Sequence, residues 1–332
     1  MTTSSIQTEY ESFYQGRPVC ITGGAGFIGS TLCHRLHELG ASVSVIDDLS
    51  SGREENLAGL DDRFRFVRGS ILDPKALSQA MDGAEIVFHQ AALTSVPRSV
   101  EEPDLYHKVN TTGTFCVLEA SRKAGAKRVV YASSSSVYGE QVESPKVESM
   151  RPDPRSPYAA AKCAGECLLN AWAHSYGLST ISLRYFNIFG PRQRPDSPYA
   201  AVIPRFAEAM LGNMPITIYG DGTQTRDYTH VTNAIHANLL AGSSRRDLKG
   251  ECFNIACGVS TDLLELITLM SHHYDVKPQI EYAPMRPGEV LHSLASIDHA
   301  RELIGYEPLC SFELGLTDVL AYYQSGFTVA RS

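Results

Sequence analysis

The sequence lacks the features that mark several common classes of protein. No apolar run approaches the ~18 residues that a membrane-spanning helix needs. Positive charge is in deficit, with 29 Lys and Arg residues against 37 Asp and Glu residues and a net charge of -8. No long basic run is present that would follow a phosphate backbone. We therefore expect neither a membrane protein nor a nucleic-acid partner.

Cysteine is also scarce. The chain has eight cysteines, none in a Cys-x-x-Cys pair and none beside His at the spacing of a zinc site. Cys163 and Cys167 lie one helical turn apart, but two thiols without a third ligand do not predict a metal site. The first sixteen residues are polar and partly acidic, unlike a signal peptide. We expect reduced thiols, no metal and a cytoplasmic protein.

What the sequence does have is a regular alternation of strands and helices. Short apolar runs predict buried strands over residues 18–22, 42–47, 65–69, 85–90, 127–133 and 178–184. Apolar residues three and four apart predict helices over residues 30–39, 74–81, 106–124 and 157–176. This order predicts an α/β fold, a Rossmann-type doubly wound parallel sheet with helices on both faces.

The character of the sequence changes after about Asn187. The proline-rich segment from Gly190 to Pro198 interrupts regular structure. We predict a smaller C-terminal α/β lobe, with ligands in the cleft at the carboxyl edge of the sheet. The predicted parts are an N-terminal extension, which either packs as a short helix or stays loose (1–16), a Rossmann domain (17–186, with 226–258 returning to it) and the smaller lobe (187–225 and 259–330).

The first predicted strand runs into a glycine-rich turn that opens a helix. Residues 23–29 contain both G-x-G-x-x-G and G-x-x-G-x-x-G. Glycines at such a turn let the backbone approach a pyrophosphate, whose charge the helix N-terminus favours. Asp47 ends the next strand, where its carboxylate can accept hydrogen bonds from an adenosine ribose. The spacing predicts an NAD site, while Arg53 leaves NADP as an alternative.

A second pattern suggests proton-transfer chemistry. Tyr158 and Lys162 are spaced to lie on one face of a helix. A phenol works as a base near neutral pH if a cation within about 4–6 Å favours its phenolate, and Lys162 is placed to be that cation. The serine run 133–136 leaves a buried strand at the ligand-binding edge, which favours a substrate or proton-relay role.

Together these residues resemble the extended short-chain dehydrogenase/reductase superfamily and, within it, the nucleotide-sugar 4-epimerases. The resemblance runs from Val19 to about Gly305. Besides the glycine turn and the Tyr-Lys pair, the matching motifs are His89–Ala92, Asn110–Thr114, Arg184–Asn187, Gly220–Gly222, Arg226–Tyr228 and Arg286–Glu289.

The resemblance implies roles for individual residues. Ser134, Tyr158 and Lys162 are expected to be catalytic, with Tyr158 as the acid/base. Expected cofactor contacts, besides Tyr158 and Lys162, are Gly23, Gly26, Phe27, Ile28, Gly29, Asp47, Ser51, Gly52, Ser70, Ile71, Gln90, Ala91, Ala92, Thr94, Asn110 and Tyr185. Expected UDP-sugar contacts are Ser134, Ser135, Ser136, Asn187, Val202, Thr217, Tyr219, Arg226, Arg286, Glu289 and Ser293.

The implied reaction is NAD-dependent oxidation of the sugar at C4, rotation of the 4-keto sugar and reduction on its other face. Ser293 stands where the resemblance places a pocket residue near the C2 substituent, and its small size leaves room for an acetamido group. The sequence is most similar to UDP-N-acetylglucosamine 4-epimerases, and UDP-glucose and UDP-galactose stay open as substrates. A homodimer is expected from the family.

Three alternatives are considered. A 4,6-dehydratase places an Asp-Glu pair after its catalytic Ser or Thr, whereas this chain has Ser135 and Ser136, which are not a proton-transfer pair at neutral pH. A UDP-glucuronate 4-epimerase or decarboxylase stays open, because serines or an arginine can meet a carboxylate. A non-catalytic dinucleotide-binding protein is disfavoured by the intact catalytic residues. The chain departs from the usual family pattern at three positions: Ser70, where many relatives have an Asp near the adenine amino group, Thr94, where some have a cofactor-contacting Lys, and Asn233, where Asp is frequent.

Overall fold

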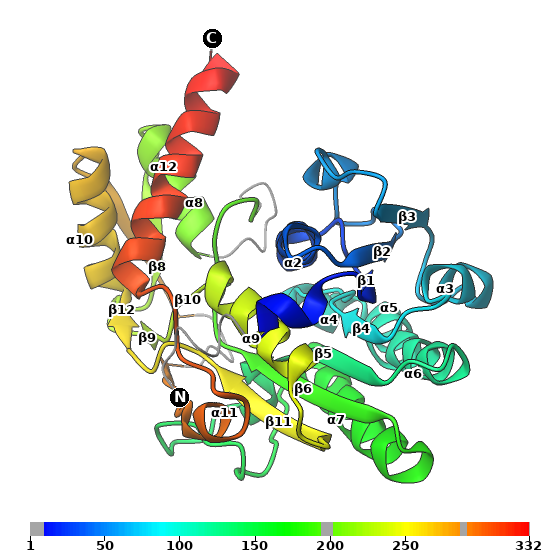
Figure 1. The fold of residues 1–332 in the computed structure, drawn as a ribbon. Helices are drawn as coiled ribbons and strands as arrows, with labels where there is room; N and C mark the ends of the chain where they lie inside the picture. Colours follow the sequence, from blue (N-terminus) through cyan, green and yellow to red (C-terminus); the bar gives the residue numbers. More distant parts are fainter. Residues whose placement is uncertain (1–9, 194–201, 286–290, 332) are drawn as a thin grey trace.

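The computed structural model describes residues 10–193, 202–285 and 291–331. Its centre is a seven-stranded parallel sheet in the order β11-β6-β5-β4-β1-β2-β3 (Figure 1). The predicted Rossmann-type fold is confirmed, and β11 is a strand that we had not predicted. The strands are β1 (Pro18–Thr22), β2 (Ser42–Asp47), β3 (Phe64–Arg68), β4 (Ile86–His89), β5 (Arg128–Ser134), β6 (Ser179–Tyr185) and β11 (Lys249–Ile255).

Helices cover both faces of this sheet (Figure 1). One face packs against α2 (Phe27–Glu38) and α9 (Val231–Ser243), in a core that includes Leu32 and Ala234. The other face packs against α3 (Pro74–Ala80), α6 (Gly113–Lys123) and α7 (Pro157–Tyr176). Strands such as β1 and β4 are therefore apolar on both faces, which is why they read as short continuous apolar runs. In β6 the apolar Ile181 and Leu183 alternate with the buried polar residues Thr180 and Ser182.

The predicted helix over 106–124 is interrupted. The chain forms α5 (Pro103–Tyr106), a π-helical segment (His107–Thr112) and then α6. Two contacts lie at this segment and just after it. The Asn110 side chain is bonded to the Leu93 backbone, and the space beside Gly113 is filled by Ile71, whose Cδ1 is 2.5 Å from where a Cβ would be. Single π-helical turns of this kind often lie at functional sites.

The N-terminal extension packs on the Rossmann domain where it is described. Residues 10–14 are helical, and Tyr10 and Tyr14 are buried. The Tyr14 hydroxyl donates to the Leu239 carbonyl of α9 at 2.8 Å. Of the two alternatives that the sequence left open, a packed helix is the one that the structure shows for these residues.

A second lobe continues from the sheet edge. Its core contains Phe189, Phe206, Leu266 and Phe312. These come from four segments that lie far apart in the sequence. The lobe consists of β7 (Ile188–Phe189), α8 (Val202–Leu211), β8 (Ile216–Tyr219), β9 (Thr225–Arg226), β10 (Thr229–His230), β12 (Thr261–Asp262), α10 (Leu263–Tyr274), β13 (Ile280–Ala283), β14 (His292–Ser293) and α12 (Phe312–Arg331). The helix α11 (Asp298–Ile304) instead packs against β11, and its Ala300 and Ile304 belong to the core of the Rossmann domain.

Three negative findings apply to the described residues. None of their helices is long and apolar enough to cross a membrane. They contain no group of three or more potential metal ligands among His, Cys, Asp and Glu. All eight cysteines are free thiols.

Candidate functional site

The three predicted catalytic residues meet at the carboxyl edge of the sheet. Ser134 ends β5 opposite Tyr185 of β6, and Tyr158 and Lys162 occupy the first turns of α7. Tyr158 and Ser134 share a hydrogen bond. The Lys162 Nζ lies 5.8 Å from the centre of the Tyr158 ring and donates to the Ala132 carbonyl at 2.8 Å. The structure therefore brings together the group that the sequence predicted.

The protonation states at this edge are governed by burial. Burial raises the pKa of Tyr158, and its hydrogen bond with Ser134 acts in the opposite direction. Burial lowers the pKa of Lys162 to about 7, which the nearby Glu166 carboxylate partly offsets. The role of Lys162 in favouring the phenolate stays a prediction. A further positive charge beside the phenol would favour the phenolate.

A buried ion pair lies directly behind these residues. Glu166 and Arg184 have side chains only 7% and 4% exposed, and the guanidinium contacts both carboxylate oxygens, at 2.8 and 2.9 Å. The carboxylate also accepts a 2.6 Å hydrogen bond from Ser133. Lys162 and Glu166 together therefore attach α7 to the end of β5. Sequence reasoning had missed Glu166, although it stands one helical turn after Lys162.

The glycine turn has the shape that a dinucleotide needs. Gly23 has φ of +70°, and a Cβ there would lie 2.6 Å from Ala91. A Cβ on Gly29 would lie 2.1 Å from the Gly23 carbonyl oxygen. The first helical residue of α2 is Phe27, and its N-cap, Gly26, contributes no side chain. The N–H groups of this helix end are therefore open to an anion, as a pyrophosphate site requires.

Asp47 lies beside this turn. Its Oδ2 accepts from the Ala25 N–H at 2.9 Å, and its Oδ1 accepts from the Leu49 N–H at 2.8 Å. Burial raises the pKa of Asp47, and these two N–H groups act against that rise. Each oxygen retains acceptor capacity for a ribose hydroxyl. Gly52 packs closely here, since a Cβ would come within 2.8 Å of the Ala25 backbone.

Two predicted cofactor residues, Gln90 and Tyr185, bond to each other and to an unpredicted third residue, Asn238. The Asn238 amide of α9 donates to the Tyr185 hydroxyl at 2.7 Å and accepts from Gln90 at 3.0 Å, while Tyr185 donates to Gln90 at 3.2 Å. Asn110 uses both ends of its amide on the Leu93 backbone, at 2.9 and 2.8 Å. It therefore shapes the loop that carries Ala91, Ala92 and the exposed Thr94.

The other predicted cofactor positions surround the same edge. Ser70 accepts a hydrogen bond from the Leu72 N–H at 3.3 Å, and Ile71 is buried against the π-helical turn. Ile28 lies in the first turn of α2, and Ser51 is exposed in the loop after β2. Ligand contact by any of these residues stays a prediction.

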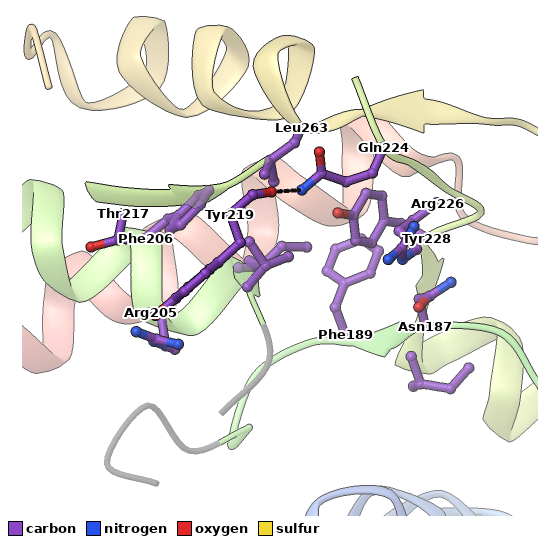
Figure 2. A pocket seen from close by; sticks show the side chains of 13 residues that line it. Asn187, Phe189, Arg205, Phe206, Thr217, Tyr219, Gln224, Arg226, Tyr228 and Leu263 are labelled. Atoms are coloured by element: carbon purple, nitrogen blue, oxygen red, sulfur yellow. Dashed lines mark hydrogen bonds between the residues drawn. The ribbon is translucent and has the colours of Figure 1, made fainter. Parts of the chain in front are cut away.

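A cavity of about 290 Å³ lies in the second lobe (Figure 2). Figure 2 shows Thr217 and Arg205 toward one end of it and Asn187 with Arg226 toward the other. Five predicted substrate residues line it, namely Asn187, Val202, Thr217, Tyr219 and Arg226. Eight lining residues were not predicted, namely Ile188, Phe189, Ile203, Arg205, Phe206, Gln224, Tyr228 and Leu263.

Three of the unpredicted lining residues, Ile203, Arg205 and Phe206, lie on one helix that has a sequence signal. Ile203 and Phe206 are three apart on α8, an amphipathic helix that no sequence-based prediction had covered. Gln224 fixes the wall by donating to the Tyr219 carbonyl at 3.0 Å (Figure 2). A helical-period search of residues 202–211 would have found α8.

Ser293 is adjacent to this cavity. It lies on β14, which pairs with β9 so that Ser293 is opposite Arg226. Ser293 is half-buried. The predicted substrate residues Arg286 and Glu289 lie outside the described residues. Ser135 and Ser136 follow Ser134 in a short 3-10 helix (Ser135–Tyr138), where Ser136 donates to the Ser134 hydroxyl at 3.0 Å.

Comparison with known proteins agrees with this geometry. The model of the NAD dependent epimerase/dehydratase family matches residues 19–256. The chain belongs to this family. The predicted membership of the extended short-chain dehydrogenase/reductases and the prediction of NAD as cofactor are thereby confirmed.

Several members of the epimerase/dehydratase family match over nearly their full length. A UDP-glucose 4-epimerase of Mycolicibacterium smegmatis is 38% identical, covering 92% of this chain and 98% of that protein. The structure of a Methanobrevibacter ruminantium UDP-N-acetylglucosamine 4-epimerase with UDP-N-acetylmuramic acid has a TM-score of 0.90 at 38% identity, covering 94% of this chain and 99% of that one. A Bacillus cereus UDP-glucuronic acid 4-epimerase has a TM-score of 0.86 at 32% identity, covering 93% and 99%.

Proposed function

We propose that this protein is a UDP-sugar 4-epimerase that interconverts UDP-N-acetylglucosamine and UDP-N-acetylgalactosamine, with UDP-glucose and UDP-galactose as further substrates. The observation that carries the proposal is the meeting of Ser134, Tyr158 and Lys162 at the sheet edge where the chain enters the cavity-bearing lobe. The similarity to 4-epimerases over nearly the whole chain supports it.

The residues divide the work of the reaction. Tyr158 takes the proton from the sugar 4-OH and returns it after the 4-keto sugar has turned, and Ser134 hydrogen-bonds the reacting oxygen. The glycine turn and Asp47 hold the dinucleotide. When bound, NAD supplies reversible acceptance of the hydride from C4 of the sugar. The positive charge of its oxidised nicotinamide favours the phenolate of Tyr158. Lys162 holds the end of β5 and the cofactor ribose.

The cavity fits a nucleoside diphosphate. Asn187 and Arg226 are placed to bind the diphosphate, because a guanidinium matches two phosphate oxygens at once. Thr217 and Tyr219 also line the cavity (Figure 2), and in this proposal they would frame the uracil. Ser293 supports the N-acetylated substrate, because its small side chain lies beside Arg226.

A second candidate substrate is UDP-glucuronate. The similarity to a UDP-glucuronic acid 4-epimerase favours it, and the hydroxyls of Ser134, Ser135 and Ser136 can donate to a carboxylate. A dehydratase lacks support at the same place, since these serines do not form an acid/base pair.

The deciding experiment is proton NMR of the sugar anomeric region after incubation with UDP-N-acetylglucosamine and no added cofactor. Parallel samples contain UDP-glucose or UDP-glucuronate. Formation of UDP-N-acetylgalactosamine is the expected result. Conversion of UDP-glucose alone would refute the argument from Ser293, and conversion of UDP-glucuronate alone would select the second candidate. Conversion of none of the three would overturn the epimerase proposal.

We also propose that the enzyme is a homodimer that pairs through α6 and α7. Phe115 on α6 is 44% exposed and Tyr176 on α7 is 55% exposed. Both contact Trp172, with ring centres 5.5 and 5.4 Å away, so they form one aromatic surface. Analytical ultracentrifugation tests this, with Phe115→Ser expected to shift the dimer toward monomer.

A further inference from the structure

Asp227 is fully buried in the second lobe and does not line the cavity. Its Oδ1 accepts from the Cys257 N–H at 2.9 Å. Its Oδ2 accepts from the Gly258 N–H at 3.0 Å and from the Ala295 N–H at 3.4 Å. One carboxylate therefore connects the end of β9 to the loop after β11 and to the segment after β14.

The backbone of Asp227 makes a further contact with the cavity wall. Its carbonyl accepts from the Asn187 amide at 3.1 Å, and the nearby Thr229 N–H donates to the Asn187 carbonyl at 3.3 Å. Asn187 has φ of +39°, a backbone conformation that costs free energy unless its surroundings hold it. The segment that begins at Asp227 supplies this support.

The strands beside Asp227 carry the other groups expected to contact the substrate. Arg226 precedes it and is opposite Ser293 in the pairing of β9 with β14. Arg226 also donates to the Leu291 carbonyl at 3.1 Å. Ala295, which donates to the Asp227 carboxylate, lies two residues after Ser293.

We propose that Asp227 is a positioning residue for substrate binding, which sets the relative places of Asn187, Arg226 and Ser293 through its carboxylate and its carbonyl. The inference rests on the proposed function. It adds that the geometry of the diphosphate and sugar contacts depends on a buried charge that touches neither ligand.

The electrostatic setting of Asp227 is consistent with this role. Burial raises its pKa to about 6, because the three N–H groups compensate for lost hydration only in part. The titratable groups that face it are Cys257, whose pKa is raised to about 12, and Tyr306, whose pKa is raised well above its ordinary value. Both are neutral at pH 7, so the ionised carboxylate is the charged group of this cluster.

The test is the Asp227→Asn variant, which keeps the shape of the side chain but replaces one accepting oxygen with an NH2 group. In either orientation the NH2 group of the amide faces at least one of the three N–H donors, Cys257 on one side or Gly258 and Ala295 on the other, and leaves it without an acceptor. We expect KM for the UDP-sugar and Kd for UDP, measured by calorimetry, to rise about tenfold or more, because charge-assisted bonds of this kind are lost. We expect kcat to stay within about twofold and bound NAD to be retained.

The matched control is Asp262→Asn in the same lobe. Asp262 caps α10 by accepting from the Glu265 N–H, a role that Asn fills equally well, so KM should be unchanged. If Asp227→Asn does not fold, Asp227→Glu retains the charge, displaces it by one methylene and should raise KM in the same way.

An unchanged KM and Kd would overturn the positioning role, as would equal losses in kcat, NAD content and melting temperature. A wild-type protein that binds UDP and epimerises no UDP-sugar would instead refute the proposed function, and the Kd comparison would still test Asp227.

Discussion

Two regions of this molecule bury a carboxylate, and they neutralise it differently. Behind the predicted catalytic residues, Glu166 is paired with the guanidinium of Arg184. In the second lobe, the described partners of the Asp227 carboxylate are three backbone N–H groups. The ion pair joins one side chain to another, whereas the bonds of Asp227 join a side chain to the backbone of two other segments. The first arrangement mainly secures packing at the sheet edge, and the second secures the relative position of loops.

The largest effect is expected from a substitution that should lower kcat without changing the affinity for UDP. Tyr158→Phe removes the only proposed proton acceptor at the sheet edge and leaves the cavity intact. We expect kcat to fall about 10³-fold, within the range for loss of general acid/base catalysis, with Kd for UDP and NAD content unchanged. Steady-state kinetics and calorimetry measure this. A comparable loss in UDP binding would show that the two regions are not independent.

Breaking the charge pair should mainly affect stability. Glu166→Ala leaves Arg184 buried without its partner, which costs about 3–5 kcal/mol in comparable cases. Urea unfolding measures the change in the free energy of unfolding. The control is Glu102→Ala, whose partner Arg98 is in a pair with side chains 42% and 43% exposed, and which should cost less than about 1 kcal/mol. An equal loss in the free energy of unfolding for the two variants would show that the buried pair contributes no more to stability than the exposed one.

The contribution of Asp227 to the free energy of unfolding should depend on pH. Its pKa is raised from 3.8 to about 6 on folding, so the folded state binds this proton more tightly than the unfolded chain does. The free energy of unfolding therefore receives a contribution that is full below about pH 4 and is lost as pH rises to about 6. We expect this loss in the wild type and not in Asp227→Asn. Denaturant titrations at several pH values measure the free energy of unfolding of both proteins. The same dependence on pH in the wild type and in Asp227→Asn would contradict this expectation.

A smaller effect is expected far from both regions. Tyr14→Phe removes the hydrogen bond to the Leu239 carbonyl and leaves the buried ring in place. We expect a loss of about 1 kcal/mol in the free energy of unfolding, with kcat and KM unchanged. A change in KM would show that the extension influences the substrate lobe through α9.

The same two regions differ in how far the sequence predicts them. The meeting of Ser134, Tyr158 and Lys162 at the sheet edge was predictable because these residues stand in short motifs. Parallel strands also bring their carboxyl ends together, as with Ser134 and Tyr185. The cavity was predicted in part. Lining residues that stand in recognisable sequence motifs were predicted. Arg205 and Leu263 were not, because their positions depend on the packing of α8 against α10.

Some features had no local signal at all. The π-helical turn at Asn110 depends on Ile71 and Leu93, which lie about forty and seventeen residues earlier in the chain. The partners of Asp227 lie at similarly large separations. Such contacts follow from tertiary packing, which periodicity and propensity do not encode.

The position of β11 has a consequence for synthesis on the ribosome. This strand completes the sheet beside β6, yet the chain makes the first part of the second lobe, from β7 to β10, and then α9 between the two. Until residue 255 has left the exit tunnel, β6 is an open edge with unpaired N–H and C=O groups, which other nascent chains can join. Translation speed between β6 and β11 therefore sets how long each new molecule is exposed to aggregation.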